Sequence, residues 1–260
     1  MTPLEPNTQL KYGPLVHELH DALKATCFQG LRDRQGRKEL MTRLLGTGIS
    51  QAMYLVSELQ AAMVQPGDVC EFGVAQGATS ALLANEIRET EKTLWLYDSF
   101  AGLPKPSSKD SLKDDIFNLG SMARYEGEMR CDIEEVQVRL RQISFPESRV
   151  QLRPGLVEET LTDENGPRQV CFAYVDFDFY AGITHALGYL HRHLAPGGRI
   201  VVDDYDFFST GAKTAVDEFV SRHHGAYELI LPQAFAGHFC ILRPVETRWK
   251  RWFSHTRSRK

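Results

Sequence analysis

The chain has 260 residues, of which 42% are hydrophobic and 25% charged, with a formal net charge of −4. This length allows one large domain or two small ones, and the acidic balance disfavours nucleic acid as the main partner. No stretch resembles a signal peptide or a segment that spans a bilayer, and the five cysteines lack metal-ligand spacing, so we expect a cytoplasmic protein with no integral membrane segment.

Residues 1–65 are expected to form an N-terminal helical cap. Apolar residues recur at helical spacing over 15–23, 40–45 and 50–63. Pro66 and Gly67 then break the pattern. A second copy of the chain could pack on these helices, so we consider a homodimer.

From residue 66 to 245, strand and helix patterns alternate, which predicts an α/β domain. Strands are expected at 69–73, 93–97, 149–152, 170–175, 199–202, 227–231 and 238–242. Helices are expected at 78–90, 157–161, 182–194 and 213–223. The alternation implies a mostly parallel sheet with helices on both faces, in which ligands bind at the carboxyl ends of the strands. The last two strands predict an antiparallel hairpin.

Two segments depart from this alternation. Residues 102–148 are too long for a simple connection, and we interpret them as a lid with a helix at 133–143. A passive surface excursion is the alternative. The tail, 246–260, is basic and aromatic, and is either a frayed terminus or an attachment to an anionic surface.

The first strand ends in a glycine loop that indicates a nucleoside cofactor. Gly73 and Gly77 allow a tight turn and close approach to a ligand, but Ala75 stands where a dinucleotide fingerprint needs its second glycine. Asp98 ends the next strand, where an acidic residue commonly binds ribose hydroxyls. S-adenosylmethionine fits this pattern, with Glu71 and Gly73 near its amino-acid part. Ordinary strand–helix packing is the alternative, and the missing glycine disfavours a nicotinamide oxidoreductase.

Four aspartates follow two of the expected strands. Asp176 and Asp178 follow one strand, and Asp203 and Asp204 follow the next. If the strands are parallel neighbours, these carboxylates meet at one edge of the sheet. Two like charges at about 4 Å repel by roughly 4 kcal/mol at an effective dielectric constant of 20. A bound cation would offset this repulsion, so the pattern predicts a metal site.

At this point the chain resembles the macrocin O-methyltransferase family over about residues 40–243. The resemblance lies in PGDVCEFGV (66–74), YDSFAGLP (97–104), VDFDFY (175–180) and VDDY (202–205). It implies a Rossmann-like class I methyltransferase fold with a seven-stranded sheet, using S-adenosylmethionine and Mg²⁺. It places the metal on Asp176, Asp203 and Asp204, and makes Asp178 the candidate base. It places the cofactor on Glu71, Gly73, Asp98 and Ser99.

These residues together predict Mg²⁺-dependent methylation of an oxygen. Mg²⁺ prefers six oxygen ligands, so three carboxylates leave room for two neighbouring substrate oxygens and a water. We therefore expect a small natural-product acceptor with neighbouring hydroxyls, such as a sugar or another vicinal diol. Asp176 would take part through the metal, while Asp178 would remove the proton. The alternatives are a catechol-type phenol acceptor and a non-catalytic binding protein on a degenerate methyltransferase fold.

Overall fold

The computed structural model describes residues 6–245 and, for side chains, residues 12–245. Seven strands form one sheet in the order β3-β2-β1-β4-β5-β7-β6. The strands are β1 (Asp68–Phe72), β2 (Leu94–Asp98), β3 (Val150–Pro154), β4 (Val170–Val175), β5 (Leu194–Val202), β6 (Tyr227–Ile230) and β7 (Cys240–Pro244). β1 to β5 are parallel, while β7 runs antiparallel to both β5 and β6.

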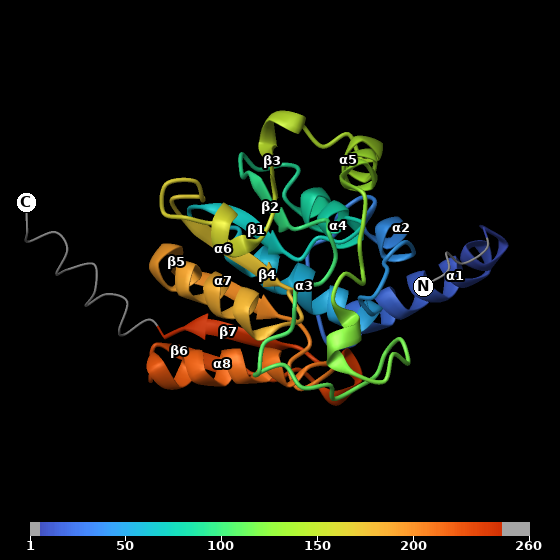
Figure 1. Cartoon of the computed structure of the whole chain (residues 1–260). Helices are drawn as coiled ribbons and strands as arrows, with labels where there is room; N and C mark the ends of the chain where they lie inside the picture. Colours follow the sequence, from blue (N-terminus) through green and yellow to red (C-terminus); the bar gives the residue numbers. More distant parts are fainter. Residues whose placement is uncertain (1–5, 246–260) are drawn as a thin grey trace, which may run out of the picture.

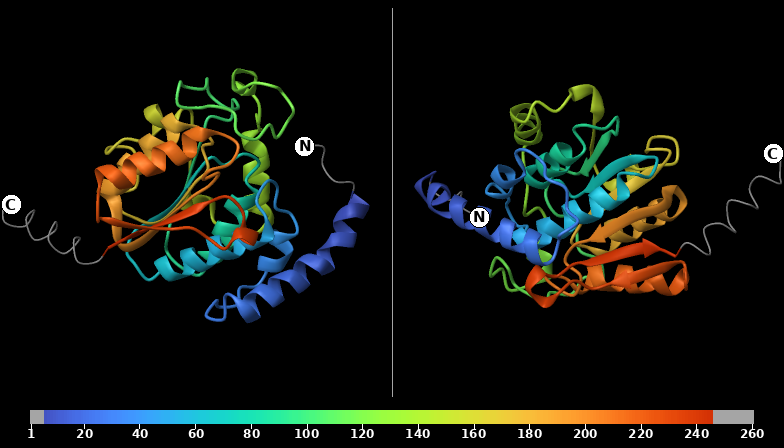
Figure 2. Two further views of the ribbon diagram at one scale, coloured as in Figure 1. Left: turned by 90° about the horizontal axis from the view of Figure 1, so that it is seen from below. Right: turned by 180° about the vertical axis from the view of Figure 1, so that it is seen from behind.

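Helices cover both faces of this sheet (Figures 1 and 2). The α-helices are α1 (Pro6–Thr26), α2 (Arg37–Met41), α3 (Ile49–Ala62), α4 (Ala78–Glu86), α5 (Ile133–Gln142), α6 (Val157–Thr160), α7 (Tyr180–His193) and α8 (Thr210–Arg222). Short 3-10 helices are η1 (Met122–Tyr125), η2 (Glu147–Arg149) and η3 (Ala234–Ala236). Buried side chains of α6, α7 and α8 pack on one face, and those of α3, α4 and α5 on the other. α1 and α2 form an outer layer against α3 and α4.

The apolar run in β4 arises because both of its faces are covered. Ala173 and Val175 pack with α7 and α8, while Phe172 and Tyr174 pack with α3 and α4. Every residue of β4 is buried. Such burial contributes roughly 25 cal/mol per Å² of apolar surface, which makes β4 the centre of the core.

The strand register sets the site. Phe72 pairs with Tyr97 on one side and with Val175 on the other, and Val175 pairs with Val202. The four strands therefore end level with one another. As a result, the residues that follow them emerge at one edge of the sheet.

The α/β class, the mostly parallel seven-stranded sheet and the terminal hairpin are confirmed, with differences at the boundaries. β5 begins at Leu194 because the Pro-Gly-Gly turn at 196–198 continues the strand. The hairpin does not extend the sheet in chain order, since β7 lies between β5 and β6. No helix among the described residues is long and apolar enough to cross a membrane.

The inserted segment contains the expected helix, α5, which begins after its N-cap Asp132. α5 lies against the start of α4, and a side chain added at Gly77 would press on Val136 at 3.0 Å. The rest of the insertion runs along the carboxyl edge of the sheet towards α8 (Figure 1). Its role as a lid stays a prediction, and the basic tail, 246–260, lies outside the described residues.

Candidate active site

Glu71 on β1 has a buried carboxyl group, and one of its two oxygens has no hydrogen-bond partner. Its side chain is only 1% exposed, and Ser80 at the start of α4 donates a hydrogen bond to Oε2. Oε1 is buried and has no hydrogen-bond partner. Burial raises the pKa of Glu71 to about 8, with the charge of Asp98 adding to the effect and the Ser80 hydrogen bond opposing it. A buried acceptor without a donor is costly, so this oxygen fits an incoming cationic or N–H group.

Gly73 is the point where β1 touches the loop after β4. It has a φ of 87°, and a side chain added there would overlap the carbonyl oxygen of Asp176. No other residue type fits this position without moving the backbone. Gly77, with a φ of 77°, begins α4 on the opposite side of the loop.

Asp98 holds the glycine loop in shape. Its Oδ2 accepts hydrogen bonds from the backbone N–H groups of Val74 (2.7 Å) and Ala75 (2.9 Å). Its Oδ1 accepts one from Phe100 N–H at 2.7 Å. An ionised carboxylate has about four acceptor positions, so one remains. Ser99 is engaged locally, since its hydroxyl donates to Gly102 O at 2.9 Å.

Three aspartates come together where β4 and β5 end. Carboxylate oxygens of Asp176, Asp178 and Asp204 lie within 4.8 Å of one another, which is close enough to share one cation. Asp178 and Asp204 adopt positive φ angles of 58° and 52°. Such backbone strain is typical of functional sites. Burial raises the pKa of all three, and the neighbouring carboxylates raise it further.

Asp203 lies beside this group and is held by hydrogen bonds. Gln51 Nε2 on α3 donates to Oδ1 at 2.6 Å, and Tyr174 OH on β4 donates to Oδ2 at 2.5 Å. The same hydroxyl lies 3.2 Å from Asp176 Oδ2. Tyr174 thus connects Asp176 and Asp203, two of the three ligands predicted from the sequence. The tightest group of three contains Asp176, Asp178 and Asp204, with Asp178 in place of Asp203.

A pocket of about 430 Å³ opens next to these aspartates. Asp203, Asp204 and Gln51 form its polar wall, and Leu19, Ile49, Phe207, Phe235 and His238 are among its other lining residues. The imidazole of His238 stacks on Phe207 with ring centroids 4.7 Å apart. This volume and lining suit a small organic molecule with one polar edge and an apolar body.

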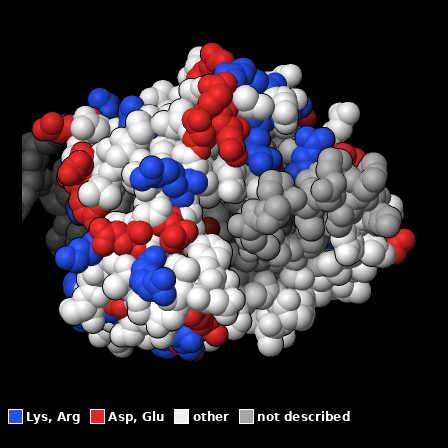
Figure 3. All heavy atoms as spheres, turned by 45° about the vertical axis from the view of Figure 1, so that its right-hand side comes forward, with Lys and Arg blue, Asp and Glu red and all other residues white. Residues whose placement is uncertain are grey.

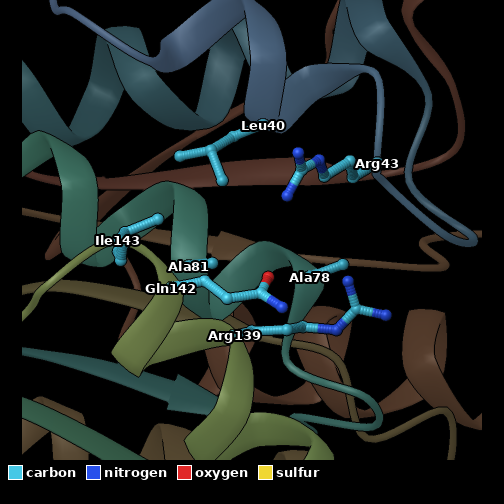
Figure 4. A pocket seen from close by; sticks show the side chains of 7 residues that line it. All are labelled: Leu40, Arg43, Ala78, Ala81, Arg139, Gln142 and Ile143. Atoms are coloured by element: carbon cyan, nitrogen blue, oxygen red, sulfur yellow. The ribbon is translucent and has the colours of Figure 1, made fainter.

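A second opening, between α2, α4 and α5, is too small for an organic ligand. Arg43 and Arg139 lie on either side of it, with Ala78 and Leu40 on its walls (Figure 4). Its volume is about 10 Å³, no more than one water molecule needs. On the face shown in Figure 3, acidic and basic side chains are mixed rather than segregated.

Comparison with known proteins identifies the group to which this site belongs. A family model described as macrocin-O-methyltransferase matches residues 47–231, which contain the glycine loop, Asp98, Ser99 and the four aspartates. The chain belongs to the macrocin O-methyltransferase family.

Two curated O-methyltransferases are similar to this chain over part of their length. A tetracenomycin 4'-O-methyltransferase from Streptomyces olivaceus, named for a dimethoxy-rhamnosyl substrate, is 27% identical over 161 residues, 61% of this chain and 59% of the relative. Mycinamicin III 3''-O-methyltransferase from Micromonospora griseorubida is 28% identical over 64% of this chain and 65% of the relative. The matched regions thus span about three fifths of the length of these two relatives.

Solved structures agree with the fold of the macrocin O-methyltransferase family. The O-methyltransferase NovP has a TM-score of 0.67 with 22% identity, covering 90% of this chain and 99% of that chain. The calicheamicin methyltransferase CalS11 has a TM-score of 0.58 with 19% identity, covering 94% and 93%. The fold is therefore that of a Rossmann-like class I methyltransferase.

Sequence reasoning missed several residues of this candidate site. Gln51 and Tyr174 were not identified, because a polar residue on an apolar helix or strand gives no sign of its partner. Asp110, in the insertion, accepts a hydrogen bond from Tyr180 N–H at the start of α7. Phe179 is the N-cap of that helix and offers no side-chain acceptor, so Asp110 supplies it. The hydroxyls of Tyr180 and Tyr205 donate to Glu218 and Asp217 of α8.

Proposed function

We propose that the chain is an S-adenosylmethionine-dependent and Mg²⁺-dependent O-methyltransferase that acts on a hydroxyl of a small natural product, in a sugar or another vicinal diol. The observation that carries this proposal is the contact between Gly73 and Asp176, which brings the glycine loop against the aspartate cluster. Family membership and the names of the relatives support the reaction class and the sugar acceptor. We further propose that the protein works in the cytoplasm, does not act on nucleic acid, and forms a homodimer.

The residues of the glycine loop fit the cofactor. Glu71 Oε1 is buried without a donor, and a ligand ammonium group would supply one. Asp98 keeps one acceptor position for a ribose hydroxyl after its three backbone hydrogen bonds. Gly73 and Gly77 have positive φ angles and no side chain at the two ends of the loop, and Ser99 steadies the turn that follows Asp98.

The aspartates fit a hard divalent cation. Carboxylate oxygen is the ligand type that Mg²⁺ prefers. Burial, and then the charges of the neighbouring carboxylates, raise the pKa of Asp176 and Asp204, so a bound cation would stabilise their ionised forms. We propose Asp176, Asp203 and Asp204 as the ligands. The hydrogen bonds from Gln51 and Tyr174 to Asp203 are of the kind that orient ligating carboxylates.

In this arrangement the chain positions the acceptor and moves one proton. When bound, S-adenosylmethionine supplies an electrophilic methyl group and Mg²⁺ lowers the pKa of an acceptor hydroxyl. The pocket beside Asp203 and Asp204 holds the acceptor. Asp178, on the same cluster, accepts the hydroxyl proton.

Calorimetry with S-adenosylmethionine tests the cofactor site. We expect the wild type to bind, and Asp98→Asn to bind at least about tenfold more weakly, because the amide cannot accept from both the loop and a ribose as the carboxylate does. Asp98→Asn is preferable to Asp98→Ala, which also removes the hydrogen bonds that shape the loop. No binding by the wild type at millimolar cofactor would refute the proposal and favour a non-catalytic binding protein.

Two substitutions distinguish a metal ligand from the general base. Asp203→Asn should weaken Mn²⁺ binding and restore turnover partly at high Mg²⁺ concentration. Asp178→Asn should lower turnover by about 10² to 10⁴-fold with Mn²⁺ affinity little changed, the range expected for loss of a general base. If instead Asp178→Asn weakens Mn²⁺ binding and Asp203→Asn does not, the cation is held by Asp176, Asp178 and Asp204.

Measuring turnover with different acceptors tests which class of acceptor the protein methylates. Sugars and other vicinal diols should be methylated in the presence of Mg²⁺ and not in the presence of a chelator. Turnover of catechols with no turnover of aliphatic diols would favour the phenol acceptor instead.

A further inference from the structure

We propose that Asp110 is a positioning residue that ties together the two loops of the aspartate cluster and thereby sets the cation affinity of that cluster. The inference rests on the proposed cation site and adds a function to the inserted segment, which the sequence marked only as a lid. Asp110 is 7% exposed, although the insertion around it is mostly polar.

The first tie is to the loop after β4. Asp110 Oδ1 accepts a hydrogen bond from Tyr180 N–H at 2.8 Å. Tyr180 is the first residue of α7, whose N-cap Phe179 offers no side-chain acceptor. Asp110 therefore caps α7 from a distance, and a carboxylate at a helix N-terminus is favourable with the helix dipole. The capped residue stands two positions after Asp178.

The second tie is to the loop after β5. Ser209, the N-cap of α8, lies with its hydroxyl 3.4 Å from Asp110 Oδ1. A side chain added at Gly211, in the first turn of α8, would collide with the same oxygen. One carboxylate oxygen thus sits where the starts of α7 and α8 meet. α7 begins two residues after Asp178, and α8 begins six residues after Asp204.

The other oxygen anchors Asp110 within the insertion. Oδ2 accepts hydrogen bonds from Ser107 N–H at 2.8 Å and from Ser107 Oγ at 2.6 Å. Both carboxylate oxygens are therefore satisfied, one locally and one at the helix starts. The side chain cannot move without breaking at least one of these hydrogen bonds.

Backbone pairing fixes the same segment to the second loop. Lys113 N–H donates to Phe208 O at 2.8 Å, and Thr210 N–H donates to Ser111 O at 3.0 Å. Leu112 forms an isolated antiparallel bridge with Ser209. Residues 109–114 thus run antiparallel to residues 208–210, and this pairing restricts the position of Asp110.

A small apolar cluster reinforces the connection. Phe179 and Phe208, one from each loop, are stacked with centroids 6.0 Å apart and pack with Tyr125 of the insertion. Tyr125 also contacts Phe208 edge-on at 4.8 Å. The loops are therefore held from outside the sheet by the insertion, and not only by β4 and β5.

The cluster needs such support because its members repel one another and are strained. Asp178 and Asp204 have positive φ angles, which are unfavourable for residues other than glycine and persist only where the surroundings impose them. Without the tie, the loops could relax apart and the carboxylates would separate. Part of the free energy of cation binding would then be used to bring the carboxylates back together, so the cation would bind more weakly.

The experiment measures Mn²⁺ binding by calorimetry on the full chain, with Asp110→Ala, Asp110→Asn and a control, Asp115→Ala. Asp115 is also in the insertion and also accepts three hydrogen bonds, from Leu119 N–H, Gly120 N–H and Tyr125 OH, but it touches neither aspartate loop directly. We expect Asp110→Ala to weaken Mn²⁺ binding about 10- to 100-fold, the usual effect of losing an outer partner of a metal site. Asp110→Asn, which keeps an oxygen for Tyr180 N–H, should fall between Asp110→Ala and the wild type.

Two readouts distinguish a positioning role from general damage to the fold. S-adenosylhomocysteine affinity should stay within about twofold in Asp110→Ala, because the glycine loop is on other strands, and excess Mg²⁺ should restore turnover. Equal Mn²⁺ affinity in Asp110→Ala and the wild type would overturn the inference while leaving the proposed function intact. An equal loss in Asp115→Ala would also overturn it, since the insertion as a whole would then be responsible. If the wild type binds no Mn²⁺, the cation site fails and this role fails with it.

Discussion

Glu71 is the side chain whose ionisation the fold alters in the most informative way. It is buried on β1 with one oxygen bonded to Ser80 and the other unpartnered, and its pKa is raised to about 8. At neutral pH the carboxyl is therefore mainly protonated in the ligand-free protein. A cationic ligand group beside it would favour the ionised form, so ligand binding and proton release are linked.

Glu71→Gln tests that linkage. The raised pKa of Glu71 contributes stability that is fully present below about pH 4.5 and is lost as pH rises through about 8. The wild type should lose on the order of 3 kcal/mol from this group between pH 5 and 8, and Glu71→Gln should not. Denaturant unfolding at several pH values measures the difference. In the wild type, cofactor binding at pH 7 should also release a proton, which calorimetry in buffers of different ionisation enthalpy detects; identical proton release in Glu71→Gln would contradict this reading.

At the scale of elements, α2 is fastened to α4 by a buried ion pair. Arg37 Nε and Nη2 donate to the two carboxylate oxygens of Glu86 at 2.7 and 2.8 Å, and both side chains are at most 1% exposed. Gln60 of α3 donates to the same carboxylate at 2.9 Å. Side chains of three helices, α2, α3 and α4, therefore meet at the Glu86 carboxylate.

Removing one partner of this pair should be costly. We expect Arg37→Met to lower the free energy of unfolding by about 3–5 kcal/mol, because Glu86 is left buried without its counter-charge. The double variant Arg37→Met/Glu86→Leu should recover much of that loss, since no charge remains buried. Urea denaturation measures both. A double variant no more stable than the single one would show that packing, and not the unpaired charge, dominates.

The contact between α7 and α8 gives a second prediction at this scale. His191 of α7 stacks on His223 at 3.7 Å between ring centroids and is hydrogen-bonded to Tyr227 OH at 3.0 Å. Burial, and then the charges of His223 and Arg192, lower the pKa of His191 to about 4. A lowered pKa means that this stability is present above about pH 6.5 and is lost as pH falls towards 4.

His191→Gln should therefore flatten the acid side of the stability profile. We expect a difference of roughly 1 kcal/mol between pH 7 and 5, because the ring is half-buried and solvent screens part of the effect. Thermal unfolding at several pH values measures it, with His17→Gln on α1 as the control. An unchanged acid slope in His191→Gln would contradict the assignment.

Over the whole molecule, sequence patterns predicted the central strands of the sheet better than the order of the strands at its edge. Strands buried on both faces, such as β4, produce apolar runs that are visible in the sequence. The place of β7 was not predictable, since an antiparallel strand can join whichever edge is free. Asp98 and the four aspartates could be found because they follow strands directly. Asp110 could not, because its partners Tyr180 and Ser209 are 70 and 99 residues away and its own segment has no periodicity.

The predicted homodimer belongs to this scale. α1 carries a row of exposed apolar side chains, Tyr12 (53%), Leu15 (57%) and Leu19 (43%), on the outside of the molecule. We expect light scattering to give a dimer mass at micromolar concentration, and Leu15→Glu to shift it towards monomer. Val64→Glu, which changes an exposed valine after α3, should leave the mass unchanged. A monomer mass for the wild type would contradict the prediction.

The position of β7 has a consequence for how the protein is made. β5, which leads into Asp203 and Asp204, has β7 as its outer neighbour, and β7 comes after β6 in the chain. While the ribosome is still synthesising residues 240–244, the outer edge of β5 has no strand beside it, although everything else at the aspartate cluster has already been translated. The nascent protein must therefore shield an open strand edge until the last described strand emerges. A premature stop after β6 would release a chain with all its candidate catalytic residues and an aggregation-prone edge beside them.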